Sequence, residues 1–228
     1  MKIFSALAVK EVVAPASRSF TEETGEPVDS VFGPVGMMQG KITAGEAGDL
    51  AILIPTALET LQQAGTLTSE RWDLGRVGIG VTIKEGATSP DFSTPEAFKQ
   101  MLLNARSIAL TDPNVGGTAG IYLAGLLERM GIAETIRPKV QWQKNGFFTA
   151  QAVANGEAEL GMTQVSEIVA VRGAVNAGPL PEPLQTVTTY CAGVFAASTA
   201  QDKARAFIEK LRSPALEPKW KQAGFDRP

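Results

Sequence analysis

The sequence predicts an α/β protein with two lobes, each a mostly parallel sheet flanked by helices, joined by two crossing strands. Three observations lead there. Short apolar runs alternate with amphipathic stretches along the chain, which is typical of parallel β-α-β units. Residues 50–54 form a continuously apolar run, as in a strand buried on both faces. The units fall into two blocks, one ending near Leu74 and one covering about 84–184, after which the chain continues with a strand and helices.

The first block begins with a short apolar strand over residues 3–6. An apolar stripe at helical spacing follows and ends at Gly25, a residue that commonly lies just past a helix; its members are Val9, Val12, Val13, Ala16 and Phe20. Strands are then expected over 28–32 and 50–54. Helices are expected over 37–44 and from Pro55 to Gly65, since proline fits the first position of a helix.

A glycine-dotted strand over residues 77–83 crosses from the first block to the second. The run Thr94-Pro95-Glu96 combines an N-cap residue, a proline and an acid, so it predicts a helix reaching about Leu103. Further strands are expected over 107–110, 140–143, 160–164 and 186–198, and further helices from the glycine turn after residue 110 to Gly131, over 147–154, over 201–211 and over 214–223. The segment with Pro179, Pro181 and Pro183 is expected to be a loop.

The last two helices have no sheet of their own, so the simplest packing returns them to the first lobe. Lobe 1 is therefore expected to contain residues 1–78 plus 190–228, and lobe 2 residues 79–189. Two crossing strands between lobes make a hinge, and ligands favour the crevice between domains. The sequence thus predicts a ligand cleft between the lobes and hinge closure around the ligand.

Composition excludes several classes of function. The 228 residues carry 21 basic and 24 acidic side chains with no basic block, which argues against nucleic acid as a partner. No apolar run approaches the ~18 residues of a membrane span. Histidine is absent, so histidine-dependent nucleophiles and the commonest metal ligand are excluded, and no cofactor is expected. The single cysteine, Cys191, lies in an apolar run and is expected to be an inert buried thiol.

The N-terminal apolar run is too short for a secretory signal with its cleavage site. Two compartments remain open: the cytoplasm, or the periplasm if a signal peptide has been removed. A monomer is the expected state for a receptor that closes by hinge motion.

Two glycine-rich turns are the main candidates for ligand binding. Residues 111–120 and 32–36 each follow a strand and open a helix. A helix start leaves about four N–H groups without partners and carries the positive end of the peptide dipole, so it can bind a small anion. Two such turns, far apart in sequence, indicate an anion held between two lobes.

The order and spacing of several motifs resemble the type II periplasmic binding proteins, and in particular the molybdate-binding-protein-like branch of the solute receptors of ABC transporters. The motifs are Ile3-Phe4-Ser5-Ala6-Leu7-Ala8-Val9-Lys10-Glu11, Phe32-Gly33-Pro34-Val35-Gly36, Gly48-Asp49-Leu50-Ala51-Ile52-Leu53, Ile108-Ala109-Leu110-Thr111-Asp112-Pro113 and Asn155-Gly156-Glu157-Ala158-Glu159-Leu160-Gly161. The chain departs from the molybdate pattern where it has Ala8 and Val35 in place of serines and no tyrosine near Thr163-Gln164. A buried oxyanion that loses donors is costly, so the resemblance implies this fold with a ligand other than molybdate.

The residues expected to bind the ligand are Ser5, Ala6, Val35, Gly36, Thr56, Arg76, Asn114, Gly116, Gly117, Thr118 and Gln164. Structural alternatives stay open for several of them: helix capping for Thr56 and Thr118, packing of a strand end for Ser5, and an ion pair with Asp73 for Arg76. Backbone N–H, amide and hydroxyl groups with some apolar wall suit a small organic anion, such as a di- or tricarboxylate.

Two functions follow from the resemblance. The first is a solute-binding protein that captures this anion and delivers it to an ABC permease. The second is an isomerase on the same scaffold, of the aconitate isomerase type, which shifts an allylic proton and needs one positioned acid or base but no metal. No residue of the sequence identifies that base.

Overall fold

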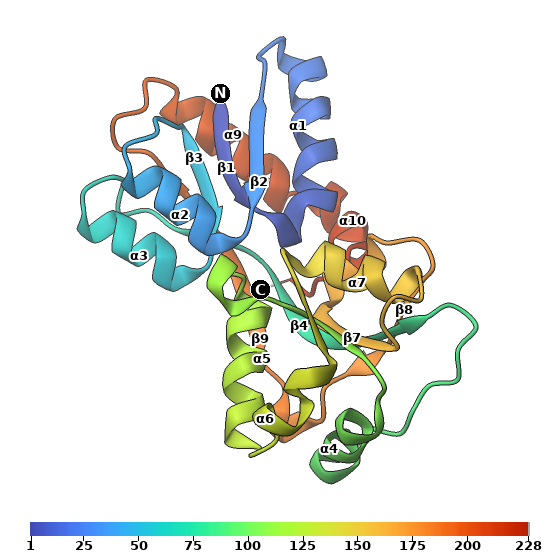
Figure 1. The fold of residues 1–228 in the computed structure, drawn as a ribbon. Helices are drawn as coiled ribbons and strands as arrows, with labels where there is room; N and C mark the ends of the chain where they lie inside the picture. The colour runs from blue at the N-terminus through green and yellow to red at the C-terminus, as the bar shows by residue number, and fades with distance from the viewer. Residues whose placement is uncertain (228) are drawn as a thin grey trace. The chain divides into compact units, whose positions relative to one another are not determined.

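The computed structural model describes residues 1–227, which form two compact units (Figure 1). Unit 1 consists of Met1–Arg76 together with the chain from Thr188 onward, and unit 2 is Val77–Val187. Strand β4 (Trp72–Lys84) carries the chain from unit 1 into unit 2, and β9 (Val187–Val194) carries it back. At both crossings the chain passes from one unit to the other two residues before the position expected from the sequence.

The sheet of unit 1 has the strand order β2-β1-β3-β9. Strands β1 (Lys2–Ala6), β2 (Asp29–Gly33) and β3 (Leu50–Leu53) run parallel, and β9 pairs antiparallel with β3. The central strand β3 is buried along its whole length, as its continuous apolar sequence predicts. In this register Ser5 lies beside Phe32 on one side and Ile52 on the other.

Helices cover the strands of unit 1 (Figure 1). Helix α1 (Lys10–Thr24) packs with α9 (Gln201–Arg212), and α2 (Val35–Thr43) packs with α3 (Pro55–Gln63). The predicted stripe of α1 is buried, and Gly25 ends the helix in the left-handed conformation. Helix α10 (Glu217–Gln222) buries Trp220, whose Nε1 donates to the Leu211 carbonyl at 2.9 Å.

The sheet of unit 2 is mixed. Strands β5 (Ile108–Thr111), β6 (Val140–Gln143) and β7 (Leu160–Gln164) run parallel, whereas β4 pairs antiparallel with both β7 and β8 (Ala174–Pro179). Because β5, β6 and β7 are parallel, their carboxyl ends lie at the same edge of the sheet. The glycine-rich turn of residues 111–120 lies at that edge.

The helices of unit 2 are α4 (Pro95–Asn104), α5 (Thr118–Arg129), α6 (Ala133–Ile136), α7 (Gly146–Ala154) and α8 (Val165–Val169). The expected N-cap Thr94 accepts a hydrogen bond from Ala97 N–H at 3.1 Å. An apolar core joins α4 and α5 to the sheet, with Phe98, Leu102, Leu110, Leu123 and Met162 buried in it.

The structure differs from the sequence predictions at several places. Strand β8 forms where no strand was predicted and ends at Pro179, the first proline of the expected loop. Helices α6 and α8 form where no helix was predicted, and β4 begins five residues before its predicted start. Short 3₁₀ turns also add local structure between the main elements. None of the helices in residues 1–227 combines the length and hydrophobicity needed to span a lipid bilayer.

Candidate functional site

The glycine-rich turn of unit 2 is built as a strand, a 3₁₀ turn and a helix start. Asp112 Oδ1 accepts hydrogen bonds from the Asn114 backbone N–H at 2.9 Å and from Asn114 Nδ2 at 2.8 Å. Gly116 then adopts a φ of 76°, which only glycine adopts without strain, and Gly117 is the residue before α5. The Asn114 amide therefore bonds within its own turn, and the orientation of its side chain is set by Asp112.

Helix α5 presents its first N–H groups at this turn. Its first helical hydrogen bond in the turn runs from Ile121 N–H to the Gly117 carbonyl, so the three N–H groups of residues 118–120 have no acceptor within the helix. Gly117 offers no side-chain cap. The start of α5 therefore has unpaired N–H groups at this turn, and the anion-binding role expected of them stays a prediction.

Thr118 and Gln164 meet across the sheet edge. Gln164 Nε2 donates to Thr118 Oγ1 at 3.2 Å, and the Gln164 side chain is buried at the end of β7. Thr118 is the first residue of α5 rather than its N-cap, so its hydroxyl does not cap its own helix. The structure thus brings together two predicted ligand residues that lie 46 positions apart.

A carboxyl group that the sequence analysis did not identify lies at the same edge. Thr163 Oγ1 donates to Glu167 Oε2 at 2.6 Å, and the backbone N–H groups of Gln164 and Gly146 also hydrogen-bond to this carboxyl group. Burial raises the pKa of Glu167 above its ordinary value of 4.5, and these three donors lower it only in part. Glu167 is therefore a half-buried acid that holds its proton more tightly than an exposed glutamate.

Gly146, the first residue of α7, makes room for that carboxyl group. A Cβ at this position would lie 1.9 Å from Glu167 Oε2 and 2.1 Å from Thr163 Oγ1, so any larger residue would displace one of them. The sequence signal was available, since Glu167 comes three residues after a buried strand end. It was missed because α8 has only five residues and shows no helical periodicity.

Buried hydroxyl groups complete this edge. Thr111 and Thr149 are buried, and their Oγ1 atoms lie 3.2 Å apart in a hydrogen bond. Ser166, which the sequence places after the buried strand, is buried as well, and its Oγ has no hydrogen-bond partner within residues 1–227. Hydroxyl, amide and backbone N–H groups and the buried carboxyl group of Glu167 therefore share one sheet edge. This set can hold a small anion and exchange a proton with it.

In unit 1, Ser5 and Ala6 lie at the carboxyl end of β1, and Val35 and Gly36 are the first two residues of α2. Ser5 is fully buried, and its Oγ donates to the carbonyl of Ala6 at 3.2 Å. Val35 is buried in the core, whereas Gly36 is exposed. Helix α2 makes its first bond from Met38 N–H to the Pro34 carbonyl, which leaves the preceding N–H groups without a helical acceptor.

Two other predicted residues of unit 1 have different surroundings. Thr56 is exposed on the first turn of α3, and that helix has no side-chain cap, so Thr56 does not cap it. Arg76 is exposed and donates through Nη2 to the Arg227 carbonyl at 3.2 Å. The alternative pairing of Arg76 with Asp73 is wrong, because Asp73 faces Arg71 at 3.5 Å and accepts from the Cys191 thiol.

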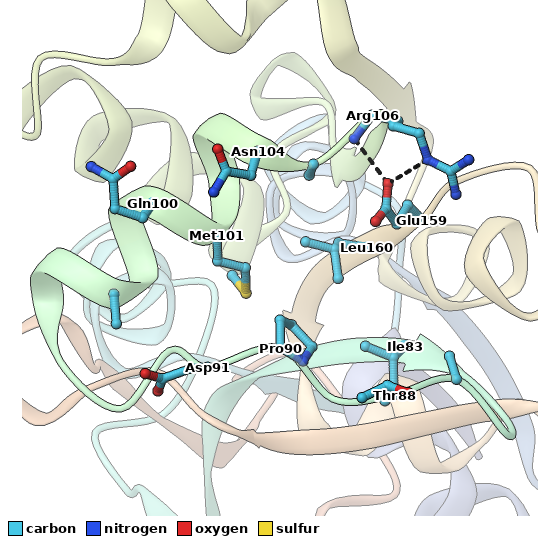
Figure 2. Close-up of a pocket in the computed structure, with 13 residues that line it drawn as sticks. Ile83, Thr88, Pro90, Asp91, Gln100, Met101, Asn104, Arg106, Glu159 and Leu160 are labelled. Carbon is cyan, nitrogen blue, oxygen red and sulfur yellow. Dashed lines mark hydrogen bonds and ion pairs between the residues drawn. The ribbon is translucent and has the colours of Figure 1, made fainter.

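A surface pocket of about 590 Å³ in unit 2 contains none of the predicted residues (Figure 2). Leu160, at the amino end of β7, lines it, whereas Gln164 ends the same strand. Its main charges satisfy each other: Glu159 Oε2 accepts from Arg106 N–H at 2.9 Å and Nε at 3.0 Å, and these bonds lower the pKa of Glu159. This pocket therefore lies at the opposite end of β7 from the hydroxyl-rich edge.

Within residues 1–227, no group of three or more His, Cys, Asp and Glu side chains is placed to hold a metal ion. Cys191 is buried, and burial together with the neighbouring Asp73 raises the pKa of its thiol to about 12. A buried thiol that ionises only at high pH is a poor nucleophile, in line with the unreactive thiol expected from the sequence.

Comparison with known families gives one match over almost the whole chain. The family described as bacterial extracellular solute-binding protein matches residues 1–226. An aconitate isomerase from a Pseudomonas species is 32% identical over 208 residues, which cover 88% of this chain and 76% of that protein.

Molybdate-binding proteins are also similar. The molybdate-binding protein of Escherichia coli strain K12 is 24% identical over 226 residues, covering 98% of this chain and 87% of that protein. Among solved structures, the periplasmic molybdate-binding protein of Azotobacter vinelandii superimposes with a TM-score of 0.80 at 17% identity, covering 100% of this chain and 99% of that one. The predicted α/β periplasmic-binding-protein fold is confirmed by this likeness.

Proposed function

Because the chain belongs to the bacterial extracellular solute-binding proteins, we propose that it binds a small di- or tricarboxylate and that it isomerises one, interconverting cis- and trans-aconitate. The observation that carries this proposal is the likeness to aconitate isomerase, which extends over most of the chain at an identity that supports a common family. The resemblance of the sequence motifs includes this activity as the second of its two functions, after solute binding.

The chemistry of the reaction fits the residues of unit 2. Moving the double bond of aconitate requires an allylic proton to leave one carbon and a proton to join another, which one well-placed acid or base can accomplish. The carboxyl ends of β5 and β7 supply hydroxyl, amide and N–H donors for carboxylates, together with the acid Glu167. These groups support the proposal without requiring a histidine, which the chain lacks.

A second candidate function is transport, and the family match favours it. In that case the protein captures the anion and passes it to an ABC permease, with no chemical change. Molybdate is disfavoured as the ligand, because Ala8 and Val35 carry no hydroxyl group at the two positions where the molybdate pattern has serines. Both candidates share an organic anion as ligand and differ only in its fate.

A thermal-shift screen tests the shared part. The purified protein is heated with molybdate, sulfate, phosphate, citrate, cis-aconitate and trans-aconitate in turn. A ligand at a hundred times its Kd stabilises a folded protein by about 2.7 kcal/mol, which is readily measured. We expect the aconitates to raise the melting temperature and molybdate to leave it unchanged. Stabilisation by molybdate alone would contradict the carboxylate assignment.

Incubation with each aconitate then separates the two functions. We expect proton NMR to show the other isomer accumulating from either starting compound until both mixtures reach one ratio. Binding without conversion would reject the isomerase and leave the transport receptor, while neither binding nor conversion would reject both.

A further inference from the structure

We propose that Glu167 is the general base that carries the allylic proton from one carbon of the substrate to the other. The assignment rests on the proposed isomerase function and names the residue that the sequence alone did not identify. It follows from the position of the carboxyl group, its hydrogen bonds and the absence of charges on the elements that surround it.

Position is the first argument. Glu167 accepts a hydrogen bond from the backbone N–H of Gln164, the last residue of β7. The side chain of Gln164 in turn donates to Thr118. Open α/β sheets bind ligands outside the carboxyl ends of their strands, and β7 ends here. The residue is partly buried, and its carboxyl group is fixed at this strand end by the protein.

The hydrogen bonds hold the carboxyl group in one place while leaving it able to act. Thr163 Oγ1 and the N–H groups of Gln164 and Gly146 are its donors. A carboxylate has about four acceptor positions, so three donors leave one for a substrate proton. The close approach of Gly146 restricts the carboxyl group further, because that residue offers no side chain to push it aside.

The surrounding elements provide no charge to neutralise Glu167. Helix α8 packs against α7, β7 and β8, and none of these three elements contains a titratable side chain. The basic residues that flank α7 and α8 in the chain are Lys144, whose Nζ lies over the Phe148 ring, and Arg172. With burial unopposed by a cation, the pKa of Glu167 is raised, which strengthens it as a base. A glutamate whose role was to form an ion pair would lie beside a cation, and α7, β7 and β8 offer Glu167 none.

The proposed step balances without a cofactor. The Glu167 carboxylate takes a proton from the methylene carbon of aconitate, and the electrons of that C–H bond form a double bond to the central carbon. The electrons of the old double bond move to the former vinyl carbon, which receives the proton back from the Glu167 carboxylic acid. One C–H bond breaks, one forms, and no atom is oxidised or reduced.

The test compares Glu167→Gln with the matched control Glu157→Gln. Glutamine keeps the size of the side chain and one acceptor oxygen but cannot take the proton. Glu157 is an exposed glutamate just before β7, at the other end of the same strand. Rates of aconitate interconversion and the shift of melting temperature on adding aconitate are measured for both variants and the unmodified protein.

We expect Glu167→Gln to lower kcat by about 100- to 10,000-fold, the usual contribution of a general base, while aconitate still raises its melting temperature. Glu157→Gln is expected to match the unmodified protein. In D₂O, the unmodified protein is expected to introduce deuterium into aconitate and Glu167→Gln to lose that exchange. If Glu167→Gln is active, the assignment of Glu167 as the base is wrong but the isomerase function stands. If the unmodified protein is inactive, the isomerase function itself is wrong.

A pH profile distinguishes a base from a merely structural residue. The kcat/KM of the unmodified protein is expected to fall as the pH drops through the raised pKa of Glu167, since only the carboxylate accepts a proton. The folded protein also holds this proton more tightly than the unfolded chain. The stability contribution of Glu167 is therefore present below the unfolded value of 4.5 and is lost as pH rises through the raised folded value.

The stability measurement needs no activity. The melting temperature of the unmodified protein is expected to fall, relative to that of Glu167→Gln, as pH rises across that window. Parallel curves would overturn the assignment. If Glu167→Gln does not fold, Glu167→Asp takes its place: it keeps the carboxylate but withdraws it by one methylene, and an unchanged kcat in that variant also overturns the assignment.

Discussion

Two glycines of helix α5 are expected to respond in opposite ways to the same substitution. Gly120 lies in the first turn of the helix, above the end of β5, and Gly125 lies five residues later. Alanine is the better helix former, so a Gly→Ala change at an open helical site stabilises a protein by about 0.5–1 kcal/mol. The structure predicts that only Gly125 is such a site.

The expected magnitudes follow from what a new Cβ would meet. At Gly120 it would lie 2.5 Å from the Thr111 backbone oxygen, about 0.9 Å closer than the 3.4 Å at which ordinary contact begins. The backbone of β5 cannot move aside, so α5 must shift, at a typical overpacking cost of about 1–3 kcal/mol. At Gly125 the nearest atom is Arg129 Nη1 at 3.3 Å, the end of a flexible, exposed side chain. The two variants should therefore differ by roughly 1.5–4 kcal/mol in stability.

Urea unfolding followed by circular dichroism measures both variants against the unmodified protein. Gly120→Ala is expected to lower the free energy of unfolding, and Gly125→Ala to leave it unchanged or raise it slightly. The shift of α5 in Gly120→Ala also moves Thr118 away from Gln164, so weaker aconitate binding is expected in that variant alone. Equal stability of the two variants would refute the close contact between α5 and β5.

Two further predictions concern buried groups of unit 1. The pKa of the buried Cys191 thiol is raised to about 12, so at pH 8 the thiol is expected to resist a disulfide reagent in the folded protein. In denaturant it is expected to react. Rapid reaction without denaturant would contradict its burial. Trp220→Phe removes the indole donor to the Leu211 carbonyl, and that carbonyl keeps the longer bond of 3.4 Å from Arg227 Nη1. We therefore expect the free energy of unfolding, measured in urea, to fall by about 1–3 kcal/mol. An unchanged midpoint would show that Arg227 or water replaces that donor.

Elements with a strong local pattern were predicted from the sequence. Helix α1 has an apolar stripe and a terminal glycine, α4 has its N-cap and proline, and β3 is continuously apolar. Strand β8 has no such pattern, and its sequence contains glycine and proline; it forms because β4 provides hydrogen-bond partners from about a hundred residues earlier in the chain. Strand structure depends on such partners more than on intrinsic propensity.

The candidate site divides in the same way. The turn around Asn114 was predicted because its glycines, its aspartate and its position after a strand are all local features. The bond between Gln164 and Thr118 and the acid Glu167 were not, because they depend on how distant segments meet. The ligand roles of all these residues stay predictions.

The order of strands and helices, the family and the two glycine-rich turns were determined by the sequence itself, because backbone preference and apolar spacing act over a few residues. Only the tertiary structure decided that a glutamate three positions after β7 lies beside the first residue of α7 and packs against three elements, α7, β7 and β8, that carry no titratable side chain. The physical reason is that solvation and charge pairing depend on every segment that packs around a group, and the sequence near Glu167 contains no information about α7.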